Sequence, residues 1–331
     1  MSVAAPIEVS KGDTEAHPED LLKGLGSAVQ GRSLWQIAWL RLRRDKVALG
    51  GGAVILLLIA AAVFGPWFAA DPLEYNQDLI DPTFQRPLDG WLHSGISADH
   101  LLGVEPTTGR DLLARILTGA RISLIVAAVA TLVSVTIGTV LGGLAGYFGG
   151  WVDTVISRAM DVFLAFPLLL FAIALVGVVP GEVLGIKGNG LRVGVLIFVI
   201  GFFNWPYIGR IVRGQTLSLR EREFIDASRS LGAGHLHIFF REVLPNLVAP
   251  IIVYATLLIP TNILFEAALS FLGVGVIPPA PSWGGMLTLA VPTYQNTPFF
   301  MIVPGMAIFI TVLAFNLLGD GLRDALDPRA R

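Results

Sequence analysis

Long apolar runs alternate with polar segments along this chain, and their length identifies the elements. Each run reaches the roughly 20 residues that a helix needs to cross a hydrocarbon layer about 30 Å thick. Helices are expected because a spanning segment in lipid must satisfy its backbone groups within itself. The pattern predicts an all-α integral membrane protein with six transmembrane helices, near residues 47–69, 121–146, 152–178, 192–214, 247–273 and 298–318.

The distribution of lysine and arginine predicts the orientation of these helices. With the N-terminus inside, 17 of the 23 basic residues fall in inner segments and 6 in outer segments. Such a bias places both termini in the cytoplasm. The exception is an outer basic cluster from Arg110 to Arg121, which is expected to form a short interfacial lead-in to the second span.

The remaining segments complete the predicted organisation. Before the first span, Trp35 and Trp39 lie beside leucines and arginines, which is typical of an amphipathic helix on the membrane surface. A helical extension of the first span is the alternative. The predicted division is a disordered cytoplasmic tail at 1–31, the interfacial helix at 32–46, the first span at 47–69, an external lobe and lead-in at 70–120, a five-helix core at 121–318 that contains a polar loop at 216–245, and a cytoplasmic tail at 319–331.

Composition supports a membrane protein and removes several kinds of chemistry. Hydrophobic residues make up 54% of the chain and charged residues 15%, too few charges to cover a soluble protein of this size. Without cysteine, disulfides, thiol nucleophiles, cysteine-based zinc sites and iron–sulfur clusters are excluded. All five histidines lie outside the predicted spans, which argues against an intramembrane serine hydrolase. No metal, cofactor or nucleic-acid partner is expected.

The polar loop carries the clearest sign of a contact surface. Residues 220–231 are predicted to form a short helix that ends at Gly232, and 235–243 a second helix that stops at Leu244-Pro245. Several large apolar side chains would be exposed if this segment were an ordinary solvated loop. We therefore expect a rigid pair of helices that fits into a cleft of a soluble partner.

Inside the spans, glycines, prolines and rare polar residues suggest packing and movement. Gly138, Gly142 and Gly146 share one helix face, which serves either internal packing or a subunit interface. Prolines 167, 206, 260 and 304 are expected to kink spans three to six.

Two acids fall inside predicted spans, where charge is expensive. For Asp161 a latch between helices is favoured over a place in the wall of a polar pathway through the membrane, whereas for Glu266 both interpretations stay open. Asn262 lies one helical turn before Glu266 and extends the same polar patch. Asp161, Asn262 and Glu266 are all candidates for lining such a pathway.

Several motifs together resemble a known family. Asp226-Ala227-Ser228-x3-Gly232 followed by Leu244-Pro245 resembles the cytoplasmic EAA loop of ABC-importer permeases. Other stretches resemble the second permease of dipeptide, oligopeptide and nickel importers: Gly109-Arg110-Asp111-Leu112-Leu113-Ala114-Arg115, Gly146-Tyr147-Phe148-Gly149-Gly150-Trp151-Val152-Asp153, Glu266-Ala267-Ala268-Leu269-Ser270-Phe271-Leu272-Gly273, Pro281-Ser282-Trp283-Gly284 and the ending 316–329. Asp226 and Ser228 replace the Glu and second Ala of the common pattern.

The resemblance implies a type I importer permease that pairs with a second permease in the bacterial inner membrane. One or two ATPase subunits and an extracytoplasmic binding protein are the implied partners, with ATP and Mg bound by the ATPases. The chain has no G-x-x-x-x-G-K-[ST] phosphate loop, so it is not expected to be an enzyme by itself. The implied ATPase-docking residues are Glu223, Phe224, Asp226, Ala227, Ser228, Leu231, Gly232, Leu244 and Pro245.

Peptides are the expected substrate. Nickel chelates, glutathione and peptide antibiotics are alternatives within the family, and a self-sufficient secondary transporter is the alternative outside it.

Overall fold

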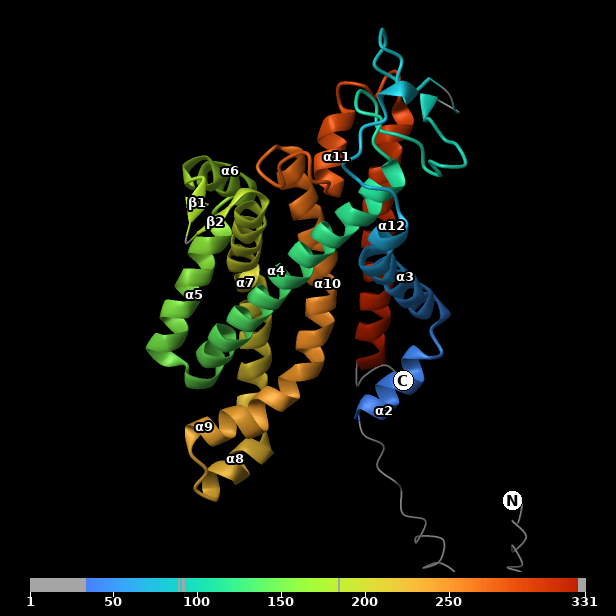
Figure 1. Cartoon of the computed structure of the whole chain (residues 1–331). Helices are drawn as coiled ribbons and strands as arrows, with labels where there is room; N and C mark the ends of the chain where they lie inside the picture. Colours follow the sequence, from blue (N-terminus) through green and yellow to red (C-terminus); the bar gives the residue numbers. More distant parts are fainter. Residues whose placement is uncertain (1–33, 89, 91–92, 184, 327–331) are drawn as a thin grey trace, which may run out of the picture.

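The computed structural model describes residues 34–88, 90, 93–183 and 185–326. Its helices run side by side along an elongated molecule (Figure 1). The predicted tail at 1–31 lies outside the described residues, as do the side chain of Trp35 and the last residues, 327–331. The helices and strands are α2 (Leu34–Leu42), α3 (Lys46–Phe68), η1 (Gln77–Leu79), α4 (Leu112–Phe148), α5 (Gly150–Ala165), α6 (Leu168–Val178), β1 (Glu182–Val183), β2 (Ile186–Lys187), α7 (Gly188–Arg220), α8 (Glu223–Ser230), α9 (His235–His237), η3 (Ile238–Val243), α10 (Leu244–Phe271), α11 (Trp283–Ala290) and α12 (Pro298–Leu326).

Five helices of the described residues are long and apolar enough to cross a membrane: α3, α4, α7, the continuous α9–α10 segment and α12. The bent pair α5–α6 makes a sixth span if it is counted as one. The two halves of this pair meet at Pro167 with a bend of 82°. Proline removes a helical hydrogen bond, so the kink predicted for the third span is confirmed. Pro206, Pro260 and Pro304, in contrast, lie within helices that continue past them.

The start of the second span differs from its prediction. The sequence placed this span at 121–146 with a separate lead-in, but α4 begins at Leu112 and runs to Phe148 as one helix. Asp111 caps it by accepting a hydrogen bond from the backbone amide of Ala114. The charges of Arg115 and Arg121 lowered the hydropathy of this stretch without interrupting the helix.

The glycine stripe of α4 packs inside the chain. A Cβ atom added at Gly142 would lie 2.3 Å from the carbonyl oxygen of Gly209, and one at Gly146 would lie 2.7 Å from that of Arg213. The backbones of α4 and α7 therefore touch along this face. Of the two predicted roles, close internal packing is the one that the structure shows.

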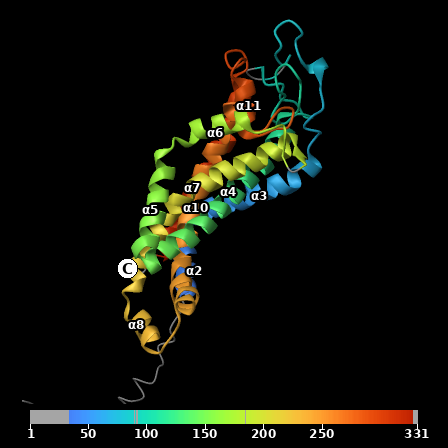
Figure 2. The ribbon, with the colours of Figure 1, turned by 90° about the vertical axis from the view of Figure 1, so that its left-hand side faces the viewer.

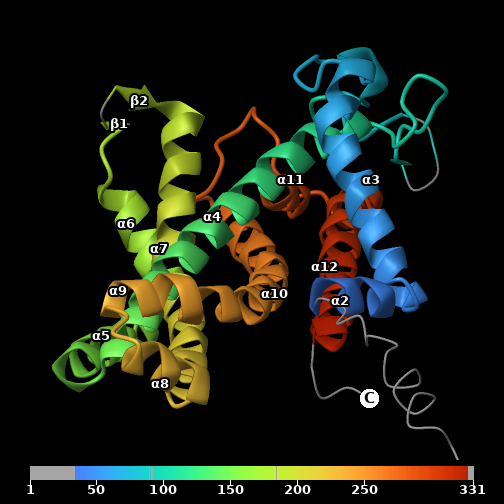
Figure 3. The ribbon, with the colours of Figure 1, turned by 90° about the horizontal axis from the view of Figure 1, so that it is seen from below.

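The ends of the molecule carry its non-spanning parts. A lobe formed by residues 71–111 lies at one end and α8 at the other, as Figure 2 shows. Seen from below, α2 lies across the end of α12, with which it packs (Figure 3). Asp45 separates α2 from α3 and caps α3 through the amides of Val47 and Ala48. The helix predicted before the first span is thus a separate element, rather than an extension of that span.

Candidate functional site

The polar loop folds into a compact knob, residues 221–243, between α7 and α10. Its first helix, α8, begins at Glu223 rather than at residue 220, because α7 continues to Arg220. Gly232 has a φ of +83°, a left-handed conformation that favours glycine. Its amide donates to the carbonyl of Arg229, and the amide of Ala233 donates to that of Ser228. The predicted turn at Gly232 is confirmed.

The second helix of the knob does not stop at Leu244-Pro245, which corrects the prediction. The chain stays helical from His235 to Phe271, passing through the π-helical segment η3 into α10. Pro245 stands at the start of the regular α-helical part, α10, directly after the π-helical segment and inside the continuous helix. The side-chain amide of Asn246 donates to the carbonyl of Glu242 at 2.6 Å, which satisfies an acceptor in the irregular turn. The knob is therefore a direct extension of a spanning helix.

An apolar anchor fixes the knob to the spans. Ile225 from α8 is fully buried, together with Ile238, Phe239 and Val243 from η3. These side chains pack in one cluster with Tyr147 of α4 and apolar residues of α7 and α10. Burying a large apolar side chain contributes about 1.5–3 kcal/mol. The anchor makes the knob part of the rigid core.

The knob also exposes apolar side chains. Leu231 is 88% exposed and Leu236 is 68% exposed, and Phe240 and Phe224 of the same segment are exposed as well. A projection that exposes several large apolar residues is typical of a protein-contact site. Of the predicted docking residues, Ser228 and Leu244 are half-buried, while the others are exposed: Glu223, Phe224, Asp226, Ala227, Leu231, Gly232 and Pro245.

Asp161 forms a bridge between two helices. Its carboxylate in α5 accepts a hydrogen bond from the Nη2 of Arg210 in α7 at 2.6 Å. Closer to the start of α5, Asp153 accepts from the guanidinium of Arg213, also in α7. The two ion pairs join α5 to α7 at two levels, which is the geometry of a latch. The part of Asp161 in the translocation path stays a prediction.

Asn262 and Glu266 are both fully buried in α10. The Asn262 amide donates to Thr131 of α4 at 2.8 Å, and its carbonyl accepts from Asn204 of α7 at 2.9 Å. Glu266 instead accepts a hydrogen bond from Ser270 at 2.8 Å. Sequence placed Asn262 and Glu266 in one patch, but the structure gives each its own partners. Their place on a translocation path stays a prediction.

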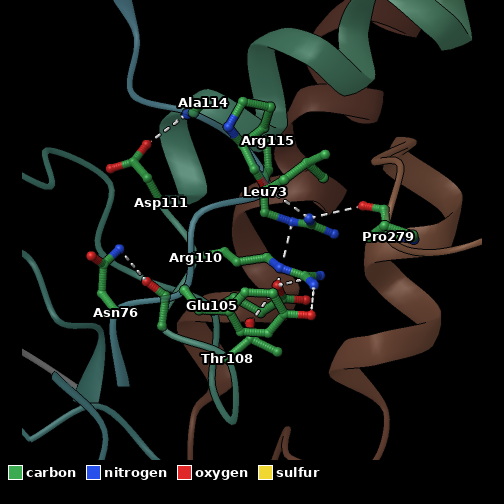
Figure 4. A network of polar contacts seen from close by, with 12 residues as sticks. Leu73, Asn76, Glu105, Thr108, Arg110, Asp111, Ala114, Arg115 and Pro279 are labelled. Atoms are coloured by element: carbon green, nitrogen blue, oxygen red, sulfur yellow. Dashed lines mark hydrogen bonds and ion pairs between the residues drawn. The ribbon is translucent and has the colours of Figure 1, made fainter. Parts of the chain in front are cut away.

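A buried ionic network in the outer lobe was not predicted (Figure 4). The Glu105 carboxylate lies 3.4 Å from the Nε of Arg115 and 3.8 Å from a guanidinium nitrogen of Arg110. Arg115 also donates to the carbonyls of Pro72 and Pro279, each at 3.2 Å. The sequence contained a signal for this network. Glu105 stands just before the basic cluster from Arg110 to Arg121, whose outer position disagreed with the predicted orientation of the spans. Arg110 and Arg115 of that cluster are therefore buried inside the protein and not on a surface lead-in, whereas Arg121 is exposed on α4.

Comparison with known families gives two matches. The family model described as "Binding-protein-dependent transport system inner membrane component" matches residues 138–331. The model described as "N-terminal TM domain of oligopeptide transport permease C" matches residues 33–87. The residues between the two matches, 88–137, comprise the later part of the outer lobe and the larger part of α4.

Curated relatives align over nearly the whole chain. A glutathione transport system permease protein GsiD of Pectobacterium atrosepticum is 42% identical over 304 residues, which are 91% of this chain and 93% of the relative. A GsiD protein of Escherichia coli O6:K15:H31 is also 42% identical, with the same coverage of both chains.

One solved structure resembles the fold. A chain of the MetNI methionine ABC transporter, determined in inward-facing conformations, aligns with a TM-score of 0.52 and 20% identity. The alignment covers 64% of this chain and 96% of that one. At this identity the likeness concerns the fold alone.

Proposed function

This chain belongs to the family of binding-protein-dependent transport system inner membrane components, and we propose that it forms the path for small peptides together with a second permease. The chain is a multi-pass inner membrane protein and a permease subunit of an ABC importer with the type I fold. The resemblance drawn from its motifs is confirmed. Peptide transport, the partners and the orientation below are the proposal.

Two separate comparisons support the substrate class. The N-terminal match is to a domain of oligopeptide permeases, and the full-length relatives are glutathione permeases. Glutathione is itself a tripeptide, so the two matches agree on short peptides.

The structure of the knob is the main support for coupling between an ATPase and the spanning helices. Its anchor continues into α10, so a push on α8 or η3 is transmitted to a spanning helix without an intervening flexible joint. Its exposed face offers Leu231, Leu236 and Phe240 to a partner. We expect an ATPase subunit to bind this face in the cytoplasm, which also places both termini on that side. ATP binding and hydrolysis then occur in the ATPases, and an external binding protein delivers the peptide.

Purification of the tagged chain from its native membrane tests the assembly. The expected result is recovery of a second permease and one or two ATPase subunits in mild detergent. The complex, reconstituted with its binding protein, should take up labelled short peptides only with ATP, and unlabelled glutathione should compete. Uptake by the chain alone without ATP would instead show a secondary transporter.

A further inference from the structure

Two motifs that are separate in the sequence meet in one joint near the outer lobe. The first, residues 266–273, ends α10, and the second, residues 281–284, begins α11. A Cβ atom added at Gly284 would lie 2.3 Å from the carbonyl oxygen of Ala267, so the two backbones touch. From the other side, a Cβ atom at Gly119 of α4 would lie 3.4 Å from Ser282. The first turn of α11 is thus held between α10 and α4.

Glu266 is the charged group in this joint. Its side chain is 0% exposed, and its Oε1 accepts a hydrogen bond from Ser270 of its own helix. The hydroxyl groups of Ser123 on α4 and of Ser282, the N-cap residue of α11, lie beside the same carboxyl group. Serines of α4, of α10 and of the N-cap of α11 therefore surround one acid.

The acid keeps an unused acceptor in this arrangement. Oε2 of Glu266 and the Oγ of Ser123 both lack a hydrogen-bond partner among the described residues. A buried polar atom without a partner costs about 1–3 kcal/mol, so its retention needs a reason. A second carboxylate oxygen that can accept from a neighbouring hydroxyl after a small side-chain rotation supplies one, because it keeps α4, α10 and α11 joined as a single body.

Other contacts fix the remainder of the segment that includes α11. The indole Nε1 of Trp283 donates to the carbonyl of Ile116 in α4 at 3.1 Å. The hydroxyl of Thr288 donates to the carbonyl of Phe271 at the end of α10, at 2.8 Å. Before α11, Arg115 of the lobe network donates to Pro279. Figure 1 shows α11 beside the upper end of α10. Residues 272–290, which we term the outer cap, are thus tied to both α4 and α10.

We propose that Glu266 is a positioning residue that locks the outer cap onto α4 and α10, so that the cap moves with these two helices as one body during transport. Complete burial by the chain's own residues assigns Glu266 to the joint and separates it from direct contact with cargo. The proposal rests on the proposed function, since movement of the cap matters only in a transporter that alternates between two states.

Substitutions at Glu266 test the positioning role through coupling. In the reconstituted complex, Glu266→Ala should reduce the stimulation of ATP hydrolysis by the binding protein roughly fivefold or more, as expected when a buried hydrogen-bond partner is lost. Glu266→Gln should keep most of the stimulation, because its amide still accepts from Ser270 and can bond the other two hydroxyls. Thr311→Val, a buried hydroxyl on α12 that bonds only within its own helix, is the matched control and should behave as wild type.

Two results would overturn the proposal. Normal stimulation in Glu266→Ala would show that the joint does not affect coupling. An equal loss in Glu266→Gln would show that the negative charge, rather than hydrogen bonding, is what transport needs. If Glu266→Ala fails to assemble, Ser282→Ala gives the milder test, since it removes one hydroxyl of the joint and should reduce stimulation in the same direction.

Cysteine labelling tests the joint without relying on transport. The chain has no cysteine, so a single Ser123→Cys places the only thiol of this chain inside the joint. In detergent-solubilised protein, this thiol should resist a water-soluble maleimide when residue 266 is Glu or Gln and react when it is Ala. Ser134→Cys, a buried serine farther along α4, should stay unreactive in all three, whereas the exposed Leu101→Cys should react in all three.

The labelling result also separates the two proposals. Protection of Ser123→Cys that does not depend on residue 266 would overturn the joint while leaving the importer function intact. Failure of the complex to hydrolyse ATP in response to any binding protein would count against the proposed function, and the labelling pattern would still decide the role of Glu266.

Discussion

The outer lobe and the polar knob occupy opposite ends of this molecule and are held in different ways. The lobe, residues 71–111, is tied to the start of α4 by buried charges, with Glu105 placed against Arg110 and Arg115. The knob has its charges at the surface and is held by an apolar anchor around Ile225 and Phe239. Removing one partner from the buried ionic network leaves a buried charge unpaired. The apolar anchor, in contrast, does not constrain the identity of the exposed residues above it, which can therefore be adapted to binding. We therefore expect substitutions in the lobe to affect stability and those on the knob face to affect coupling.

The largest effect is expected for Glu105→Ala. Arg115 is 1% exposed and Arg110 is 5% exposed, so removing the acid leaves two buried cations without their counter-charge. Breaking a buried ion pair in this way costs about 3–5 kcal/mol of folding free energy. Thermal unfolding of the purified protein, followed by tryptophan fluorescence, should show a clearly lower midpoint.

Glu182→Ala is the matched control for this change. Glu182 pairs with Lys187 in the β1–β2 hairpin, where both side chains are at least half exposed. Such pairs contribute about 0–1 kcal/mol, so the unfolding midpoint should stay close to that of the unchanged protein. Equal midpoints for the two variants would mean that the lobe network does not stabilise the fold.

The spans could be predicted from the sequence, but two helix boundaries near the ends of the molecule could not. The spans follow from hydropathy alone, because the membrane imposes their length and composition. The start of α4 was misplaced because Arg115 and Arg121 look like interface residues until the partner of Arg115, Glu105, is known. The predicted stop at Pro245 was wrong because the chain passes through the π-helical segment η3 into α10 without a break, and there the side-chain amide of Asn246 donates to the carbonyl of Glu242.

Contacts between distant residues were beyond the reach of a single sequence. Asn262 bonds Thr131, which is 131 positions away, and Asn204, which is 58 positions away. Periodicity places Asn262 on a helix face, but it does not say which helix covers that face. The turn at Gly232 was predictable because its cause, a left-handed conformation after a short helix, is local.

On the knob, Gly232→Val should uncouple transport without unfolding the spans. No atom lies within 4 Å of a Cβ added at Gly232, so space is sufficient, but the φ of +83° is strained for a β-branched residue. A left-handed conformation costs about 1–2 kcal/mol for an L-residue, enough to shift the turn and reduce coupling about tenfold. ATP-dependent uptake should fall by this factor while the unfolding midpoint stays the same.

Gly234→Ala separates the conformational requirement from the mere presence of a side chain. Gly234 has a φ of −72°, and its added Cβ also meets nothing within 4 Å. An alanine at this position should therefore keep near-normal uptake. If both variants lose uptake equally, added bulk at the turn is the cause, and the argument from backbone conformation fails.

A smaller effect is expected from Leu231→Ser, which removes the most exposed apolar side chain of the knob. Full burial of a leucine in an interface is worth about 1.5–3 kcal/mol, so the ATPase should bind roughly tenfold more weakly. Retention of the ATPase on the immobilised permease at increasing dilution measures this loss. Leu101→Ser in the outer lobe removes a side chain that is 65% exposed and should leave retention unchanged. Equal retention in both variants would remove the exposed face of the knob from the docking surface.

The smallest effect on stability is expected for a substitution of Asp161. This substitution distinguishes a residue that only joins α5 to α7 from one that contacts peptide in the translocation path. The Asp161 carboxylate is 51% exposed and bonds Arg210 at 2.6 Å, so Asp161→Asn should lower stability by only about 0–1 kcal/mol. A latch that merely joins α5 to α7 predicts uptake close to normal in this variant, and also in the exchanged pair Asp161→Arg with Arg210→Asp. A carboxylate that contacts peptide in the path predicts a loss of uptake in both, because the exchange restores the ion pair but moves the negative charge to α7. Normal uptake by the exchanged pair would therefore assign Asp161 to the latch.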